Sequence, residues 1–338
     1  MRRKLFVALF LLAFVLLVIL SVIPMSPEVQ EEPMTYRDNL EWPWEAPDSS
    51  TIPDNEEGDL IRYGRDLVAY TAWYLGPEGK VRKMSNGMNC QNCHLDAGTK
   101  PWGNNFGAVA STYPKYRERS GTVESIEKKI NDCFERSLNG KTLDSTSREM
   151  RAMVAWMKWL GKDVPKGEKP LGAGITALPY LDRPASPDAG KGVYVAKCNR
   201  CHGVNGEGLT DTITGIGYTY PPLWGKYSYS KGAGLYRISK FAGYVKDNMP
   251  FGVAHGREEL TDEQAWDVAA FVTSMERPYK DLSHDWPDIA TKPVDHPFGP
   301  FADTFSEQQH KYGPFGPIKL AREELAAAKD KSQTAKNK

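Results

Sequence analysis

Two copies of the pattern Cys-x-x-Cys-His constrain this chain of 338 residues more strongly than any other feature. Two thiols three positions apart can add to the two vinyl groups on one edge of a porphyrin, and the adjacent histidine can reach the iron from one face. A zinc ribbon would space its two cysteine pairs by about 15–20 residues, whereas here the two pairs are far apart and each has its own histidine. The pattern therefore predicts two covalently bound haem c groups with iron. The predicted attachment residues are Cys90, Cys93, Cys198 and Cys201, and the predicted proximal iron ligands are His94 and His202.

Helical periodicity surrounds each motif in the same order, which indicates a duplicated module. Apolar spacing predicts helices over 58–76, 123–139 and 147–160 in the first half, and over 232–247 and 262–276 in the second. The predicted N-terminal caps are Thr146 with Glu149, Ser186 followed by Pro187, and Thr261 with Gln264. The chain is therefore predicted to be mostly α, with two class I cytochrome c-like domains in tandem.

Composition predicts the remaining segments. Residues 25–57 are acidic and rich in proline, which is typical of an extended tether, with Trp42 and Trp44 packing loosely on the domain. Residues 279–318 combine proline with aromatic side chains, which predicts an extended strap across both domains. The predicted boundaries are 1–24 (signal anchor or signal peptide), 25–57 (tether), 58–165 (first cytochrome domain), 166–182 (linker), 183–278 (second cytochrome domain), 279–318 (strap) and 319–338 (flexible tail).

The N-terminus predicts export. Arg2, Arg3 and Lys4 precede an apolar run over 5–23, which is long enough to approach the bilayer thickness of about 20 residues and has no A-x-A-like cleavage site. We therefore expect an uncleaved helix that anchors the protein on the periplasmic side of the inner membrane, with cleavage to a soluble periplasmic protein as the alternative.

Charge and hydropathy exclude two classes of protein. The chain has 43 basic and 43 acidic residues, so its formal net charge is zero, and we expect no binding to nucleic acid, which needs a basic excess. The mean hydropathy of −0.52 excludes a polytopic membrane protein.

The iron of the second haem needs a sixth ligand. Met249 is our choice because it follows a predicted helix in the loop after the motif, and Met/His ligation is the usual c-type pair. His255 is the alternative. Met275 lies on the apolar face of a helix and is interpreted as a core residue.

Four of the five cysteines belong to the two motifs, and Cys133 is the one that belongs to neither. Met150, Met153 and Met157 share one helix face and are interpreted as core residues, which leaves no plain distal methionine for the first haem. Cys133 shares a stripe with apolar residues, so its sulfur faces inward, and cations beside it favour a thiolate. From the residues alone, Cys133 is either an inert buried thiol or a haem ligand and reactive group.

Several longer runs resemble the tetrathionate-forming thiosulfate dehydrogenases, which are dihaem c-type cytochromes. The runs are CQNCHLDAG from Cys90, INDCFERS from Ile130, EMRAM from Glu149 and WMKWL from Trp156, together with DWP from Asp285, FGPF from Phe298 and YGPF from Tyr312. The resemblance covers about residues 58–318, and the run around Cys133 is its most specific element.

This resemblance implies that Cys133 ligates the first iron opposite His94, that the first haem is the active site, and that the His202/Met249 haem passes electrons on. Arg119, Arg136 and Ser137 match positions that the family places around the substrate. Lys129 stands where the family is expected to have arginine. Lysine keeps the positive charge but lacks the guanidinium group, which can bind an anion through two N–H groups at once. The candidate catalytic residues are therefore Cys133, Arg119, Lys129, Arg136 and Ser137.

The implied reaction joins two thiosulfate ions into tetrathionate, or runs in reverse. The implied electron acceptor is a cytochrome or a membrane respiratory complex. Three alternatives remain at this point: a membrane-anchored dihaem electron carrier without a substrate site, a cytochrome of the thiosulfate-oxidising multienzyme system, and, less favoured, a dihaem peroxidase.

Overall fold

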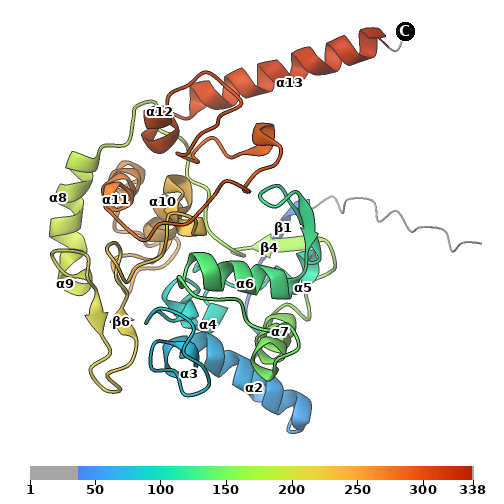
Figure 1. The fold of residues 1–338 in the computed structure, drawn as a ribbon, viewed down its shortest axis with the longest axis vertical. Helices are drawn as coiled ribbons and strands as arrows, with labels where there is room; N and C mark the ends of the chain where they lie inside the picture. Colours follow the sequence, from blue (N-terminus) through green and yellow to red (C-terminus); the bar gives the residue numbers. More distant parts are fainter. Residues whose placement is uncertain (1–36, 337–338) are drawn as a thin grey trace, which may run out of the picture. The chain divides into compact units, whose positions relative to one another are not determined.

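The structure is a computed structural model that describes residues 37–336 (Figure 1). The elements of its first half are β1 (Arg37–Pro43), η1 (Ser49–Thr51), α2 (Glu56–Ala69), α3 (Thr71–Leu75), η2 (Cys90–Asn92), α4 (Leu95–Gly98), α5 (Val109–Thr112), β2 (Lys115–Arg117), β3 (Thr122–Glu124), α6 (Ile126–Arg136), α7 (Arg148–Leu160) and β4 (Glu168–Leu171). The predicted helix over 58–76 is divided at Tyr70 into α2 and α3. The predicted cap of α7 is wrong by one residue, because the hydroxyl of Ser147, and not of Thr146, accepts from the Met150 N–H.

The second half repeats the helical order. Its elements are α8 (Pro187–Lys197), α9 (Asn199–His202), β5 (Leu209–Thr210), β6 (Tyr218–Tyr220), η3 (Gly234–Tyr236), α10 (Ile238–Asn248), α11 (Asp262–Ser274), η4 (Ile289–Thr291), α12 (Glu307–Tyr312) and α13 (Gly316–Lys336). Ser186 caps α8 with Pro187 at its start, and Thr261 with Gln264 forms the capping box of α11, so both predicted caps are confirmed. The described chain is mostly helical, and its strands form three two-stranded sheets.

The same kind of helix crossing supports each half. In the first half α2 packs on α7, and in the second half α8 packs on α11. A glycine lies at each crossing: a Cβ on Gly64 would lie 1.9 Å from the Ala152 carbonyl oxygen, and a Cβ on Gly190 would lie 1.8 Å from the Asp267 carbonyl oxygen. Only a residue without a side chain allows these backbones to approach so closely.

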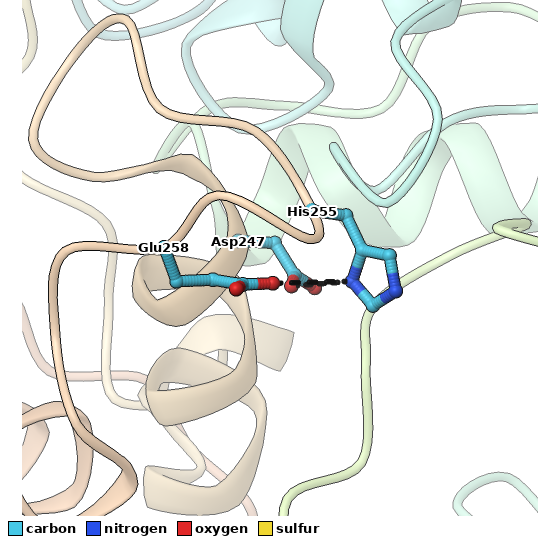
Figure 2. Close-up of side chains that lie close together, drawn as sticks. All are labelled: Asp247, His255 and Glu258. Carbon is cyan, nitrogen blue, oxygen red and sulfur yellow. Dashed lines mark hydrogen bonds and ion pairs between the residues drawn. The ribbon is translucent and has the colours of Figure 1, made fainter.

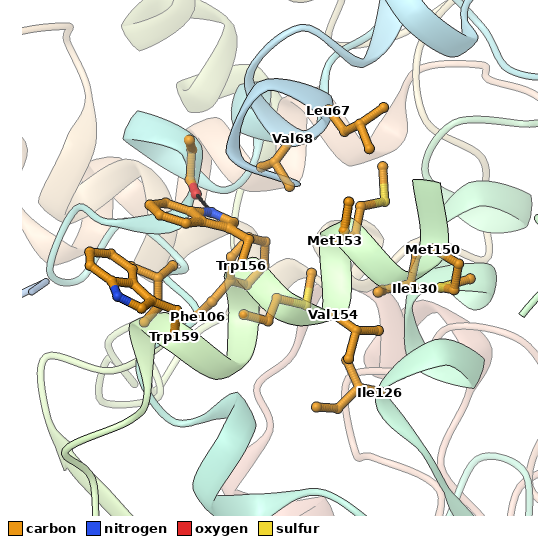
Figure 3. Packing of buried hydrophobic residues seen from close by; sticks show 14 of the residues in the cluster. Leu67, Val68, Phe106, Ile126, Ile130, Met150, Met153, Val154, Trp156 and Trp159 are labelled. Carbon is orange, nitrogen blue, oxygen red and sulfur yellow. Dashed lines mark hydrogen bonds between the residues drawn. The ribbon is translucent and has the colours of Figure 1, made fainter. Parts of the chain in front are cut away.

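The core of the first half lies between α2, α6 and α7 (Figure 3). Met150, Met153 and Met157 are buried in it, which confirms their interpretation as core residues. Trp156 stacks on Trp159 with ring centres 5.3 Å apart. Its indole N–H also donates to the Ala97 carbonyl at 2.9 Å, and Ala97 is a left-handed residue (φ 56°) just after the first motif. The α7 helix therefore holds the backbone that follows the first motif.

The described part of the predicted tether is not a free extended linker. Strand β1 pairs in parallel with β4, a strand inside the predicted linker, and Trp44 is 2 % exposed. A Cβ on Gly107 would lie 2.4 Å from the Trp44 ring, so that glycine makes room for the indole. The acidic composition was misleading because a single buried tryptophan decides where this segment lies.

The predicted strap runs over both halves. Near its start the Trp286 N–H donates to the Arg119 carbonyl at 2.7 Å, and near its end the Tyr312 carbonyl accepts from the Ala185 N–H at 2.8 Å. Trp286, Tyr312 and Phe315 are buried. The following residues, expected to fray, continue helix α13, in agreement with their content of Ala, Glu and Lys, which are good helix formers.

No helix among residues 37–336 is both long and apolar enough to cross a membrane. The run over 5–23, predicted to be a membrane anchor, lies outside the described residues.

Candidate functional site

Two hydrogen bonds fix the first motif to the N-terminal end of α3. The Asn89 side chain accepts from the Ala72 N–H at 2.8 Å, and the Thr71 hydroxyl accepts from the Cys90 N–H at 3.0 Å. The Nδ1 atom of His94 lies 2.5 Å from the Asn104 carbonyl oxygen, which can only accept a hydrogen bond. Nδ1 therefore carries the proton, and Nε2 is left for a metal. The pKa of His94 is lowered to about 4, mainly by burial and also by the Lys129 cation, while the hydrogen bond to Asn104 opposes the shift. The imidazole is therefore neutral at pH 7, as an iron ligand must be.

The second motif has the same arrangement. It follows the C-terminal end of α8, and the Tyr194 hydroxyl donates to the Gly203 carbonyl at 2.5 Å just after the motif. The His202 Nδ1 atom lies 2.8 Å from the Pro221 carbonyl oxygen, so Nε2 is again left for a metal. Both histidines thus present the same nitrogen, although their carbonyl partners come from different loops.

The residues present fit covalent haem c. A cavity of about 600 Å³ lies beside the second motif, within the range of about 300–1,000 Å³ that is usual for ligand pockets. Its lining includes Cys198, Cys201, His202 and Met249, and it extends to Cys93 of the first motif. All four motif cysteines are unbridged. In this arrangement Cys90 and Cys93 would hold one haem with His94, and Cys198 and Cys201 would hold the other with His202.

Met249 and His255 differ in their surroundings. Met249 ends α10 and lines the same cavity as His202, as a sixth ligand must. His255 lies outside this lining. Its Nδ1 atom lies 2.8 Å from an Asp247 carboxylate oxygen, with Glu258 alongside (Figure 2). The His255 ring also stacks on Trp102, with ring centres 4.1 Å apart. These contacts favour Met249 as the distal ligand and make His255 part of the contact between the two halves.

Cys133 lies beside the first motif. Helix α6 buries Ile126, Ile130 and Phe134, and this places the half-buried Cys133 on the inner side of the helix. Burial raises the pKa of the Cys90 thiol to about 11 and that of the Cys93 thiol to about 12, and an electrostatic interaction with Cys133 adds to the rise in both. The fifth cysteine is therefore within electrostatic reach of the two cysteines that would hold the first haem.

Several cations lie around Lys129, one helical turn before Cys133. Cys133 is the strongest single influence on Lys129 and raises its pKa, but burial and the cations Arg117 and Arg119 lower it more, so the net shift is downward. The pKa of Arg119 is lowered to about 10, mainly by burial and also by the Arg136 cation, while Asp285 opposes the shift. These shifts show that several cations share one poorly hydrated region, which favours an anion there.

Arg136 and Ser137 are placed differently from Lys129. The Arg136 guanidinium forms a two-pronged ion pair with Asp285, with N–O distances of 2.8 and 2.7 Å. Ser137 ends α6, and its N–H donates to the Cys133 carbonyl at 2.8 Å. Ser137 therefore fixes the backbone of Cys133, while both prongs of Arg136 already hold a carboxylate.

Sequence reasoning missed three residues at this site, namely Tyr113, Arg117 and Asp285. Burial raises the pKa of Tyr113 to about 12; the Arg117 cation opposes this, and the charges of Glu124 and Cys133 add to it. A period-two pattern could have revealed Arg117. In strand β2 Tyr116 is exposed and its neighbours Lys115 and Arg117 are half-buried, so Arg117 faces the protein, and Arg119 follows two positions later. No spacing connects Asp285 with Arg136, because they are far apart in the sequence.

Comparisons with known proteins agree with both motifs. The family model of the SoxA/TsdA cytochrome c domain matches residues 80–165, and the cytochrome c family model matches residues 187–276. A thiosulfate dehydrogenase of Psychrobacter arcticus is 39 % identical over 72 % of this chain and 71 % of its own. One from Allochromatium vinosum is 37 % identical over 69 % of this chain and 84 % of its own.

A solved structure agrees as well. The as-isolated form of the thiosulfate dehydrogenase TsdBA from Marichromatium purpuratum matches with a TM-score of 0.66 and 28 % identity, over 78 % of this chain. This chain spans about half of that one, 54 %. With two cytochrome c domains, two complete attachment motifs and relatives of this identity over most of its length, the chain belongs to the thiosulfate dehydrogenase family and is an oxidoreductase with two haem c groups.

Proposed function

We propose that this protein oxidises two thiosulfate ions to tetrathionate at the first haem site, where His94 and Cys133 would bind the iron. The second haem, whose iron His202 and Met249 would bind, would supply the route by which the electrons leave. The observation that carries this proposal is that Cys133 lies within electrostatic range of Cys90, Cys93 and the half-buried cation Lys129. A pure electron carrier has no need of such an arrangement.

The charges of the substrate explain the cations. Thiosulfate is a dianion, so joining two of them brings four negative charges together, and the protein must supply positive charge in a site with little water. Lys129 lies within electrostatic range of both Cys133 and Arg119, so we propose that Lys129 and Arg119 supply this charge. The Arg117 cation adds to the field from strand β2.

Cys133 is the proposed nucleophile. In the proposed reaction Cys133 leaves the iron, and its thiolate forms a sulfur–sulfur bond with the outer sulfur of one thiosulfate as two electrons leave. The product is a cysteine thiosulfonate. The outer sulfur of a second thiosulfate then attacks the sulfur that came from the first, which releases tetrathionate and restores the thiolate. When bound, the two haem c groups accept the two electrons one at a time. The reverse reaction, tetrathionate reduction, uses the same residues.

The proposed place of this reaction is the periplasmic side of the inner membrane, and the proposed acceptor is a cytochrome or a membrane respiratory complex. The basis is the N-terminal apolar run with its preceding cations, because c-type haem attachment and this targeting pattern both require export.

Electron paramagnetic resonance tests the proposed ligation. The oxidised protein is expected to show two low-spin signals, one typical of histidine–thiolate ligation and one of histidine–methionine ligation. Cys133→Ala is expected to remove only the first. A spectrum that is unchanged by Cys133→Ala would contradict ligation by Cys133.

Replacement of Met249 is expected to change the second haem alone. Methionine ligation raises the reduction potential of a c-type haem, so Met249→Leu is expected to lower the potential of the second haem by on the order of 100 mV in a spectroscopic redox titration. Met275→Leu is the matched control, since Met275 packs on the core at the end of α11. A potential that moves in His255→Gln and stays in Met249→Leu would assign the ligand to His255 instead.

A further inference from the structure

The strap reaches the substrate site through two neighbouring residues. The Trp286 N–H donates to the Arg119 carbonyl at 2.7 Å, and the Trp286 ring faces the Arg119 guanidinium, which lies 5.1 Å from its centre. Trp286 is itself 5 % exposed. The backbone and the side chain of Arg119 are thus both held by the same residue of the strap.

Asp285 joins two arginines. It accepts from Nη1 of Arg136 at 2.8 Å and from Nη2 at 2.7 Å, and it lies 3.9 Å from Nε of Arg119. The side chain of Asp285 is 8 % exposed and that of Arg136 is 14 % exposed. A buried carboxylate between two guanidinium groups offsets part of their mutual repulsion, and its two hydrogen bonds fix the orientation of the Arg136 guanidinium.

Arg136 is also held from the opposite domain. Its carbonyl accepts from both the N–H and the hydroxyl of Ser230, at 3.0 and 2.7 Å. The Arg136 guanidinium is bound to Asp285 and its carbonyl to Ser230, so Arg136 is not free to reorient toward a substrate. Lys129, one helical turn before Cys133, is the cation of α6 that remains for an anion beside the sulfur.

We infer that Asp285 is a positioning residue of the active site, and that Arg136 acts through Asp285 rather than by binding thiosulfate. Asp285 and Arg136 form a rigid unit that holds the Arg119 guanidinium beside Lys129, and these two cations bind the substrate. This inference rests on the proposed binding of thiosulfate beside Cys133. It also assigns the strap a function in the first domain, which is distant from it in the sequence.

A double-mutant cycle tests this inference. We expect Asp285→Asn and Arg136→Gln each to raise the KM for thiosulfate about tenfold and to change kcat by no more than about threefold, because ground-state binding is weakened while Cys133 is retained. In the double variant we expect a KM within about twofold of either single variant, because the two residues act as one unit.

Two outcomes would overturn the inference. In the first, Arg136→Gln raises the KM by the same factor in the wild type and in the Asp285→Asn background, so that the KM of the double variant is about a hundredfold above that of the wild type. Arg136 would then bind the substrate directly. If Asp285→Asn leaves KM unchanged, Asp285 positions nothing that the substrate uses.

Two further variants separate positioning from folding. Asp267→Asn is the matched control, because Asp267 is also 8 % exposed and also binds an arginine, Arg183, with two prongs, at 2.8 and 2.9 Å. We expect its KM to equal that of the wild type. Asp285→Glu keeps the carboxylate and is expected to recover most of the lost affinity; a KM as high as that of Asp285→Asn would contradict the role of the charge.

The cycle can fail independently of the proposed function. All four proteins of the cycle retain Cys133, and their KM values are compared with one another. Turnover that survives the loss of Cys133 would refute the proposal that Cys133 is the nucleophile. The coupling measured between Arg136 and Asp285 would still stand. Additive losses in the cycle would refute the positioning role and leave Cys133 as the nucleophile.

Discussion

Replacement of Cys133 by glycine is expected to lower kcat for thiosulfate oxidation by about 10³-fold or more, because the proposed reaction needs a sulfur nucleophile at this position. The measurement is steady-state turnover with thiosulfate and an artificial electron acceptor, at enzyme concentrations normalised to haem. We expect the KM to change much less than kcat, since Lys129 and Arg119 remain in place.

Glycine in the interior of α6 also weakens the helix by about 1 kcal/mol, so a second variant is needed. Cys133→Ala removes the sulfur and keeps the helix propensity, and it is expected to lose the same activity. The absorbance of the second haem serves as the check on folding. Retained turnover in either variant, with the first haem unchanged in its spectrum, would refute the role of Cys133.

The substitution Gly190→Ala is expected to destabilise the second domain by about 3 kcal/mol or more, at the upper end of what overpacking costs. The added methyl would lie 1.8 Å from the Asp267 carbonyl oxygen and 2.4 Å from its carbonyl carbon, and backbone atoms cannot move aside as a flexible side chain would. Helices α8 and α11 must therefore separate. The measurement is thermal unfolding of the haem-loaded protein followed by circular dichroism.

Gly192 provides the matched control in the same helix. A Cβ at Gly192 would meet no atom within 4 Å, and the residue is exposed. Gly192→Ala is therefore expected to stabilise the protein by about 0.5–1 kcal/mol, because alanine is the better helix former. Equal effects of the two substitutions would show that the close helix crossing does not limit stability.

Local patterns in the sequence predicted much of the fold. The caps at Ser186 and Thr261 and the buried stripe of α6 depend on residues a few positions apart, and all are confirmed. The cap of α7 was misplaced because Thr146 and Ser147 offer the same hydroxyl chemistry in adjacent positions, and Thr146 instead donates to Asp144.

Long-range contacts could not be predicted in this way. Trp44 is buried against the backbone around Gly107, and the partner of Arg136 is a carboxylate of the strap. Neither contact leaves a periodic signal, because the two partners lie on different segments and each is only one residue. Arg136 was predicted as a substrate residue because it matches a position that the family places around the substrate, and nothing in the sequence indicated that its guanidinium pairs with Asp285.

The strap has a consequence for how the protein is made. Ribosomes deliver a chain from its N-terminus, so both haem attachment motifs emerge well before Asp285 and Trp286. In the folded protein the Asp285 carboxylate contacts both Arg119 and Arg136, and a chain without the strap lacks this carboxylate. A shortened chain that ends before the strap would contain every residue needed to attach two haems and would still lack part of the proposed substrate site. Haem absorbance alone would therefore count incomplete molecules as complete enzyme.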